Sequence, residues 1–234
     1  MVLYSIFMAS ASALLPTFLL LNGREYAYAA IREYPARLDA PVNGYEAKVL
    51  DFVRQWLNGT QEFTLTTSGS TGPPTPIVLR RRQLEASAAR TADFFDLGAG
   101  DRALVCLNCE YIGGLMMLVR GLERNMHLTI VEPHADPFAH VDEASEFDFS
   151  AFVPLQLKAA LAAGRAPRLN RLKYLLVGGA PADAALVGPA IQGAHHQGEA
   201  PGPHGVALLP AGVAGRQCRR GGLRAGKNLR RERG

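Results

Sequence analysis

One short stretch of the sequence combines the residue types that can hold a phosphate group. Residues 66–76 read TTSGSTGPPTP, and an apolar run flanks them on each side. Hydroxyl groups donate hydrogen bonds to phosphate oxygens, and glycines let backbone N–H groups approach an anion closely. The stretch is not a Walker P-loop, which needs a Lys and a helix directly after the glycines. It predicts a hairpin flap over a triphosphate, although such turn-forming residues are also typical of a plain surface loop.

Two other groups of residues could carry chemistry, and the plainer interpretation is favoured for each. Cys106 and Cys109 form a Cys-x-x-Cys pair, but a zinc site needs about four ligands and a redox pair must open a helix in a particular βαβ unit. They are predicted to be ordinary buried cysteines. Five ionisable residues gather in a loop-rich region: His127, Glu132, His134, Asp136 and His140. Their spacing matches no metal site, so solvated loop residues are predicted there and no metal site is expected.

Alternating strands and helices must position these residues. An Asn22-Gly23 turn separates two predicted strands in residues 17–28. Hydrophobic spacing then predicts helices at 45–57, 80–97, 111–123 and 155–163, the second of them ended by Gly98. Strands are expected at 62–67, 76–80, 102–107, 127–132, 149–154 and 172–177. Such alternation with short connections predicts an α/β fold, with a largely parallel sheet flanked by helices.

The composition is that of a globular protein with an unusual carboxyl-terminal segment. The 234 residues are 48% hydrophobic and 20% charged, which suits one large domain or two small ones. The net charge is +4, but residues 188–234 alone carry +6, so the rest of the chain is slightly acidic. The charge therefore gives no indication of a nucleic-acid partner for the body of the protein. Three cysteines in this length favour a reducing compartment, and a cytoplasmic protein is predicted.

Both ends of the sequence depart from the pattern of the middle. Residues 1–16 are mostly apolar but lack the basic start of a secretory signal, and Ser and Pro weaken a membrane span. We expect a start codon assigned too far upstream and no stable membrane insertion. Residues 188–234 hold 11 Gly and 4 Pro without an apolar period, which predicts a disordered tail. An Arg/Gly tail that binds nucleic acid is the alternative, and the lack of stacking aromatic residues disfavours it.

The phosphate-binding candidate closely resembles the corresponding loop of the adenylate-forming superfamily, which includes acyl-CoA synthetases, luciferases and peptide-synthetase adenylation domains. Three later stretches resemble this superfamily in the same order: EYIGGLMMLVRGL, FVPLQL and LKYLLVGGAP. The early NGREY, followed by a helix ending in WLNG, is similar to some 2-succinylbenzoate–CoA ligases. The resemblance covers residues 17–187 and implies a partial amino-terminal, AMP-binding domain. It would lie between a doubtful extension, 1–16, and the tail, 188–234.

What the resemblance implies is an ATP-dependent acid–CoA ligase, most like the 2-succinylbenzoate–CoA ligase of menaquinone biosynthesis. ATP, Mg²⁺, CoA and a small carboxylate would be its substrates, through an acyl-adenylate from which CoA displaces AMP. The β- and γ-phosphates would be held by Thr67, Ser68, Gly69, Ser70, Thr71 and Gly72. The adenine wall would be formed by Gly178, Gly179, Ala180 and Pro181. The acyl pocket would include Tyr111, where many members have His, and Gly114.

Departures from the superfamily pattern predict an impaired enzyme. The loop has Thr75 after Pro74 where the family usually has Lys, and the charge-assisted hydrogen bond that Lys would donate to phosphate is worth about 1.5–3 kcal/mol. A Tyr-Gly-x-Thr-Glu motif and a domain with a catalytic Lys, expected after the adenine turn, are absent from the sequence. We expect that a frameshift near residues 190–197 replaced them. A translation of His195–Gly198 shifted by one nucleotide can give Thr-Thr-Arg-Val, which resembles the family's stretch just before the missing motif. Two alternatives remain open, a truncated ligase without identified catalytic residues and a non-enzymatic remnant with at most weak nucleotide binding.

Overall fold

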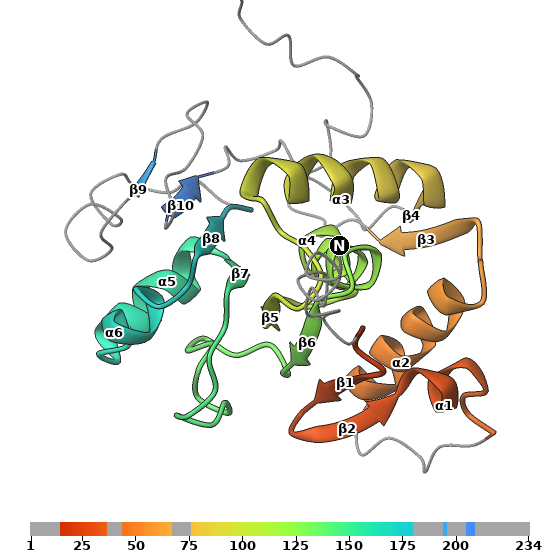
Figure 1. The fold of residues 1–234 in the computed structure, drawn as a ribbon, viewed down its shortest axis with the longest axis horizontal. Coiled ribbons are helices and arrows are strands. Elements are labelled where there is room, and N and C mark those ends of the chain that lie inside the picture. The colour runs from red at the N-terminus through yellow and green to blue at the C-terminus, as the bar shows by residue number, and fades with distance from the viewer. Residues whose placement is uncertain (1–14, 37–43, 67–75, 180–193, 196–204, 209–234) are drawn as a thin grey trace, which may run out of the picture.

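The structure is a computed structural model that describes residues 15–36, 44–66, 76–179, 194–195 and 205–208. Its central feature is a sheet with the strand order β2-β1-β6-β5-β7-β8-β10-β9 (Figure 1). The strands are β1 (Phe18–Leu21), β2 (Arg24–Ala27), β5 (Arg102–Val105), β6 (His127–Ile130), β7 (Phe149–Phe152), β8 (Tyr174–Val177), β9 (Ala194–His195) and β10 (Gly205–Leu208). Within this sheet β1 and β2 pair antiparallel, and the other described pairs are parallel. The predicted α/β fold with a mostly parallel sheet is therefore confirmed.

The amino-terminal hairpin forms where the sequence predicts it. Leu21 of β1 lies opposite Arg24 of β2, and the two residues between them, Asn22 and Gly23, have φ angles of 49° and 78°. Positive φ at both central residues is what a type I′ hairpin turn of two residues requires. The Asn22 backbone N–H also donates to the carbonyl oxygen of Ile130 at 2.8 Å. The turn is thereby fixed to the end of β6, which makes the hairpin an edge of the parallel sheet.

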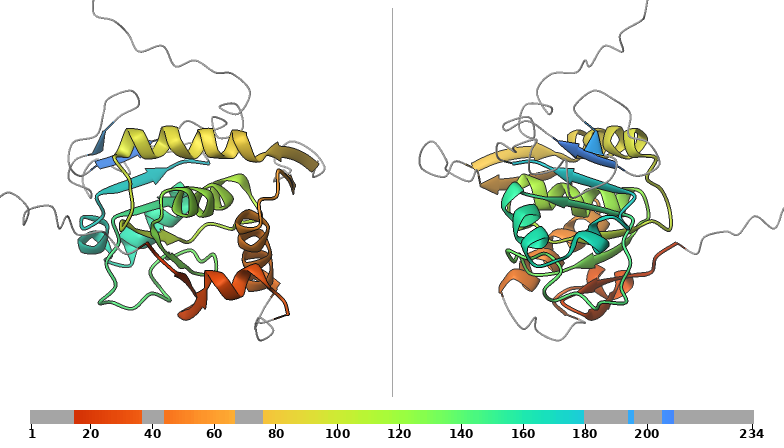
Figure 2. Two further views of the ribbon diagram at one scale, coloured as in Figure 1. Left: turned by 45° about the vertical axis from the view of Figure 1, so that its right-hand side comes forward. Right: turned by 90° about the vertical axis from the view of Figure 1, so that its left-hand side faces the viewer.

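Helices cover both faces of the sheet (Figure 2). They are α1 (Tyr28–Arg32), α2 (Gly44–Leu57), α3 (Arg81–Phe95), α4 (Ile112–Glu123), α5 (Pro154–Ala162) and α6 (Ala166–Leu169). Side chains alternate along β5, so that Ala103 and Val105 join one hydrophobic cluster while Leu104 and Cys106 join the other. Helices α2, α3 and α4 complete the first cluster, and α5 and α6 complete the second. The sheet is the middle layer between two cores.

A second, two-stranded sheet leads into α3. It consists of β3 (Glu62–Thr66) and β4 (Pro76–Arg80), which pair antiparallel with Thr66 opposite Pro76. Figure 2 shows this hairpin continuing past the amino end of α3. The Phe63 ring lies 5.2 Å from the Phe52 ring and 5.4 Å from the Trp56 ring, measured between centroids. Aromatic packing on α2 therefore fixes the base of the hairpin to the first core.

Three features differ from the sequence-based expectations. Helix α3 ends before Gly98, because Asp96 takes a left-handed conformation with φ of 49° and stops the helix. Helices α1 and α6 were not predicted, since elements of 5 and 4 residues are too short to show a helical period. Strands β9 and β10 fall within residues 188–234, where no ordered element was expected. The short run Val206–Leu208 can pair with β8 through its backbone alone, which requires no side-chain periodicity.

The described residues also bear on two predictions for the ends of the chain. No helix among them is long and apolar enough to cross a membrane. Residues 1–14 lie outside the described part, as do most of residues 188–234, including Cys218. The predicted upstream start and the predicted frameshift therefore stay predictions.

Candidate functional site

The strand order places a topological switch point between β5 and β7. The chain runs from β5 through α4 to β6 on one side, and from β7 through α5 and α6 to β8 on the other. Right-handed crossovers in opposite directions put α4 and α5 on opposite faces, which agrees with their membership of different cores. Loops diverge at the carboxyl ends of such strands, and open α/β sheets bind ligands there. The segments that follow β5, β7 and β8 are therefore the candidate site.

The segment after β5 carries Tyr111 to the start of α4. The Tyr111 backbone N–H donates to the carbonyl oxygen of Asn108 at 3.2 Å, and its own carbonyl accepts from Leu115 N–H at 3.0 Å. The side chain of Tyr111 is 46% exposed, which is unusual for an aromatic ring beside a buried helix. Lys48 of α2 holds the neighbouring Glu110, with Nζ 2.5 Å from Oε1. An aromatic surface is therefore presented at the carboxyl edge of the sheet.

Gly114, the second residue expected in an acyl pocket, is buried in the first turns of α4. A Cβ atom at this position would lie 2.4 Å from the carbonyl oxygen of Asn108 and 2.6 Å from that of Leu107. Both atoms are backbone, so neither can move aside without shifting the loop after β5. The helix therefore needs glycine here in order to approach the loop, whatever a ligand requires.

The segment after β7 belongs to the stretch FVPLQL, in which the sequence analysis gave no residue a role of its own. Val153 precedes α5, Pro154 opens it, and the side chain of Leu155 is 69% exposed. Gln156 is buried, with 5% of its surface exposed, and its amide nitrogen donates to the carbonyl oxygens of Cys106 at 3.0 Å and His134 at 3.1 Å. Gln at the third helical position is a known capping signal in sequence. Its two carbonyl partners come from distant segments, which a sequence pattern cannot reveal.

The segment after β8 carries the described half of the predicted adenine turn. Gly178 donates its backbone N–H to the carbonyl oxygen of Phe152 at 3.1 Å. Gly179 has a φ of 87°, which favours glycine, and a Cβ there would lie 3.5 Å from a methyl carbon of Val153. These two glycines therefore lie beside the start of α5. Ala180 and Pro181 lie outside the described residues.

The predicted phosphate loop also lies outside the described residues. The structure gives its two attachment points, because Thr66 and Pro76 are register partners at one end of the β3–β4 hairpin. The predicted pair of strands flanking the loop is thus confirmed. Thr67, Ser68, Gly69, Ser70, Thr71 and Gly72 themselves are not described, and their role in binding phosphate stays a prediction.

The two cysteines near the site are buried, as predicted. Cys106 is fully buried and Cys109 is 7% exposed, and both are free thiols. Burial raises the pKa of each thiol to about 12, so both remain protonated and unreactive near neutral pH. The Tyr45 hydroxyl lies 3.4 Å from Cys109 Sγ. These residues support the loop after β5 as packing groups.

Of the five ionisable residues predicted to lie in a loop, His127 lies instead in strand β6 and is half-buried, whereas the others follow that strand. The rings of His134 and His140 lie edge to face with centroids 5.2 Å apart. Asp136 pairs with Arg165, with Nε 3.2 Å from Oδ2. Among the residues that the structure describes, no group of three or more His, Cys, Asp or Glu side chains could hold a metal ion.

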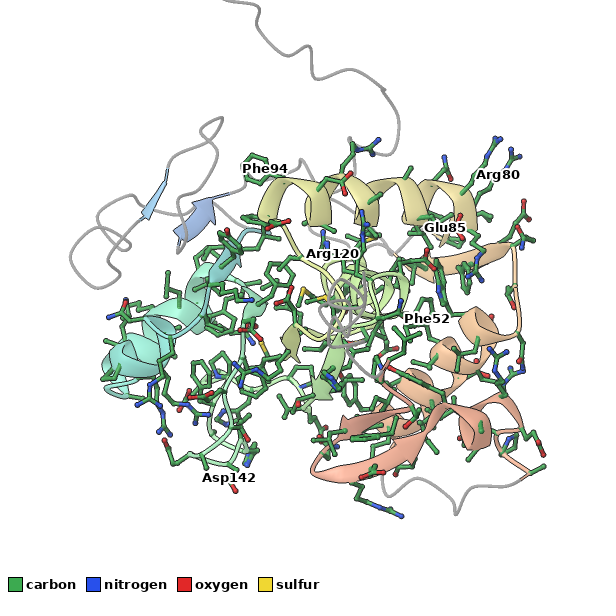
Figure 3. The ribbon with its side chains drawn as sticks, viewed as in Figure 1. Phe52, Arg80, Glu85, Phe94, Arg120 and Asp142 are labelled. Atoms are coloured by element: carbon green, nitrogen blue, oxygen red, sulfur yellow. The ribbon has the colours of Figure 1, made fainter. Side chains whose placement is uncertain are left out.

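One buried cation lies away from this edge. Arg120 of α4 is 7% exposed, and it points between the helices in Figure 3, whereas Arg80 and Asp142 lie on the outside. Burial lowers its pKa to about 10. Its Nη1 lies 3.7 Å from the sulfur of Met117, and its Nε has no hydrogen-bond partner among the described residues. This guanidinium belongs to the packing of the first core.

Comparisons with known proteins identify a family over the same region. A family model described as AMP-binding enzyme matches residues 62–193, which include the predicted phosphate loop and the strands β5 to β8. A comparison with curated proteins finds no match. A solved structure of an acyl-CoA synthetase (AMP-forming)/AMP-acid ligase II-like protein from Dyadobacter fermentans is similar, with 50% identity and a TM-score of 0.59. The match covers 64% of this chain and 43% of that protein.

Two further solved structures are more distant. The amino-terminal domain of FACL13 from Mycobacterium tuberculosis, bound to an inhibitor, is 25% identical with a TM-score of 0.46, covering 53% of this chain and 32% of that one. The o-succinylbenzoate CoA synthetase MenE from Bacillus subtilis, in complex with OSB-AMP, is 24% identical with a TM-score of 0.46. That match covers 53% of this chain and 25% of that one. The chain thus spans less than half the length of each of these proteins.

Proposed function

Because this chain belongs to the AMP-binding enzyme family, we propose that it takes part in the ATP-dependent activation of a carboxylic acid. The carboxylate oxygen attacks the α-phosphorus of ATP, an acyl-adenylate forms and pyrophosphate leaves. The thiol of CoA then attacks the acyl carbon, its proton is lost, and AMP departs to leave a thioester. The observation that carries the proposal is the family match over residues 62–193 together with 50% identity to a protein described as an AMP-forming acyl-CoA synthetase-like ligase.

In this proposal the phosphate loop and the segments after β5, β7 and β8 together bind two anions, the triphosphate and the carboxylate. Residues 67–72 hold the β- and γ-phosphates through hydroxyl and backbone N–H groups, and residues 178–181 form the adenine wall. Tyr111 and Gly114 belong to the acyl side. The exposure of Tyr111 and Leu155 supports an apolar acyl group, because both offer apolar surface at the carboxyl edge of the sheet. Positioning of the two anions then supplies most of the rate.

The finer proposal is that the acid is 2-succinylbenzoate, which would place the protein in menaquinone biosynthesis. Its support is the likeness of the early NGREY segment and of FVPLQL to 2-succinylbenzoate–CoA ligases. A second candidate function is a non-enzymatic remnant that binds nucleotide at most weakly and catalyses nothing. Thr75 in the position of the usual Lys favours this alternative, because a cationic phosphate contact is missing there.

Nucleotide-dependent thermal stabilisation tests whether this chain binds ATP. A ligand that binds only the folded state stabilises it by RT ln(1 + [L]/Kd), about 1.4 kcal/mol at a concentration ten times Kd. We expect millimolar ATP with Mg²⁺ to raise the melting temperature of the chain, and a Thr71→Val variant to lose most of that rise. Thr64→Val, on an exposed position of β3 in the same hairpin, is the matched control and should respond like the parent protein.

The same measurement separates the candidates. An unchanged melting temperature at millimolar ATP would contradict nucleotide binding altogether. A further rise when 2-succinylbenzoate is added with ATP, but not when benzoate is added, is expected for the 2-succinylbenzoate ligase. Release of pyrophosphate from ATP in the presence of that acid distinguishes a ligase from a remnant, which would bind nucleotide without releasing pyrophosphate.

A further inference from the structure

The side chain of Gln156 uses all of its hydrogen-bonding groups at the switch point of the sheet. Its amide nitrogen donates to the carbonyl oxygen of Cys106 at 3.0 Å and to that of His134 at 3.1 Å. Its amide oxygen accepts the backbone N–H of Val153 at 3.2 Å. The residue is 5% exposed, so these bonds form where water competes little.

Each partner of Gln156 belongs to the segment that follows a different strand. Cys106 directly follows β5, His134 lies in the segment after β6, and Val153 directly follows β7. Val153 in turn packs beside Gly179, which follows β8. One neutral amide therefore joins the ends of three adjacent strands and, through Val153, reaches the segment after a fourth.

Only an amide of this length satisfies all three partners. A carboxylate could accept from Val153 but would set an anion against two carbonyl oxygens, and an apolar side chain would leave all three groups unpaired. Gln83 provides a comparison, because it occupies the same third position of α3 and accepts the backbone N–H of Arg80 at 3.0 Å. The side chain of Gln83 makes no further hydrogen bond to any residue that the structure describes, so it caps its helix without joining other elements.

We propose that Gln156 is a positioning residue of the site at the carboxyl edge of the sheet. It sets the loop that leads from Cys106 to Tyr111 against the turn at Gly178 and Gly179, and so fixes where an acyl group and a nucleotide meet. The inference rests on the proposed function of this edge. Gln156 itself contacts neither Tyr111 nor the two glycines through a hydrogen bond, so its effect on them passes through the backbone of the strand ends.

The test compares Gln156→Glu with Gln83→Glu in the full chain. Each variant keeps the acceptor for its own helix cap, but Gln156→Glu alone loses donors to other elements. We expect the backbone amide NMR resonances of Tyr111, Gly178 and Gly179 to shift in Gln156→Glu and to stay in place in Gln83→Glu. Calorimetric titration with AMP should give a Kd about tenfold weaker for Gln156→Glu, as expected when a positioning hydrogen bond is lost, and an unchanged Kd for Gln83→Glu.

The possible outcomes decide between positioning and mere helix capping. Unmoved resonances, or an AMP Kd for Gln156→Glu within twofold of the parent value, would overturn the proposal. If the parent chain binds no AMP, the proposed function fails, and the resonances of the ligand-free protein alone decide whether Gln156 positions the edge. If the buried carboxylate prevents folding, Gln156→Met, compared with Gln83→Met, loses the same donors without adding charge and is judged by the same two measurements.

Discussion

Tyr111 and Gly114 lie within one turn of each other at the start of α4, yet their surroundings differ. The Tyr111 side chain is half exposed at the edge of the sheet, while Gly114 is pressed against the backbone of residues 107 and 108. A glycine in an acyl pocket is usually explained by room for a ligand. Here the close approach of helix to loop already requires it, so substitution at Gly114 should act on folding before it acts on binding.

Replacement of Gly114 by Ala should destabilise the fold by about 1–3 kcal/mol, because the added methyl group would meet backbone that cannot yield locally. Gly113→Ala is the matched control, since its Cβ would meet only a Leu107 methyl carbon at 3.4 Å. In a helix that substitution should be neutral or stabilise by about 0.5–1 kcal/mol. Urea denaturation measures both free energies of unfolding, and equal values for the two variants would show that the close approach carries no cost.

Neighbouring parallel strands are linked by different interactions at their carboxyl ends and at their amino ends. At the carboxyl ends the link is the neutral amide of Gln156. At the amino ends of β5, β7 and β8 it is a charged network, in which Asp148 accepts from Arg102 Nε at 3.0 Å and Lys173 Nζ lies 2.6 Å from Asp101 and 3.7 Å from Asp148. These charges lie at the end of the strands opposite the candidate site, so this network stabilises the sheet away from where an anionic ligand would bind.

Asp148→Asn should therefore weaken the fold in a pH-dependent way. Burial raises the pKa of Asp148, but hydrogen bonds from the side chain and backbone of Arg102, with the charge of Lys173, outweigh it and hold the pKa below its ordinary value. Since the folded-state pKa is below the unfolded value of about 3.9, this contribution is complete at neutral pH and is lost as the pH falls through the folded-state pKa. We expect a loss of about 1–2 kcal/mol at pH 7 and a smaller difference below about pH 4.

Glu146→Gln serves as the control for that measurement. Glu146 pairs with the same Arg102 at 2.9 Å, but its side chain is 57% exposed, so its removal should change the free energy of unfolding by less than about 0.5 kcal/mol. Urea midpoints at pH 7 and pH 3.5 give both differences. An Asp148→Asn loss that is the same at the two pH values would show that packing, and not ionisation, holds the strand ends.

At the scale of the whole molecule, local patterns predicted the elements but not their arrangement. The Asn22-Gly23 turn and the apolar periods of α2 and α4 are each contained in a short stretch of sequence, so the sequence alone predicted these elements. The left-handed Asp96 that ends α3 could not, because Asp is compatible with many conformations. The two carbonyl partners of Gln156 are 50 and 22 residues away in the chain, and only the strand order brings them together. The resemblance to a family suggested the candidate acyl-pocket and adenine-turn residues, whose roles stay predictions, while Leu155 and Gln156 needed the structure.

The two hydrophobic cores share one sheet, and this should make the molecule unfold as a unit. Leu104 and Val105 are adjacent on β5 and face opposite cores, so the strand cannot leave one core without leaving the other. Trp56, the single tryptophan of the chain, is buried in the first core. Its fluorescence therefore reports the unfolding of the first core. A destabilising substitution in the second core then tests whether the first core loses stability with it.

Leu104→Ala should lower the stability seen by Trp56, although Leu104 belongs to the other core. The side chain is fully buried, and truncation of such a leucine costs about 2–5 kcal/mol through lost burial and the cavity it leaves. We expect the urea transitions followed by Trp56 fluorescence and by far-ultraviolet circular dichroism to move together, as a two-state unit requires. Leu155→Ala, the same change at a side chain that is 69% exposed, should move neither by more than about 0.5 kcal/mol. A Trp56 transition that stays in place while the dichroism transition shifts would show that the cores unfold separately, with the sheet dividing at the switch point between β5 and β7.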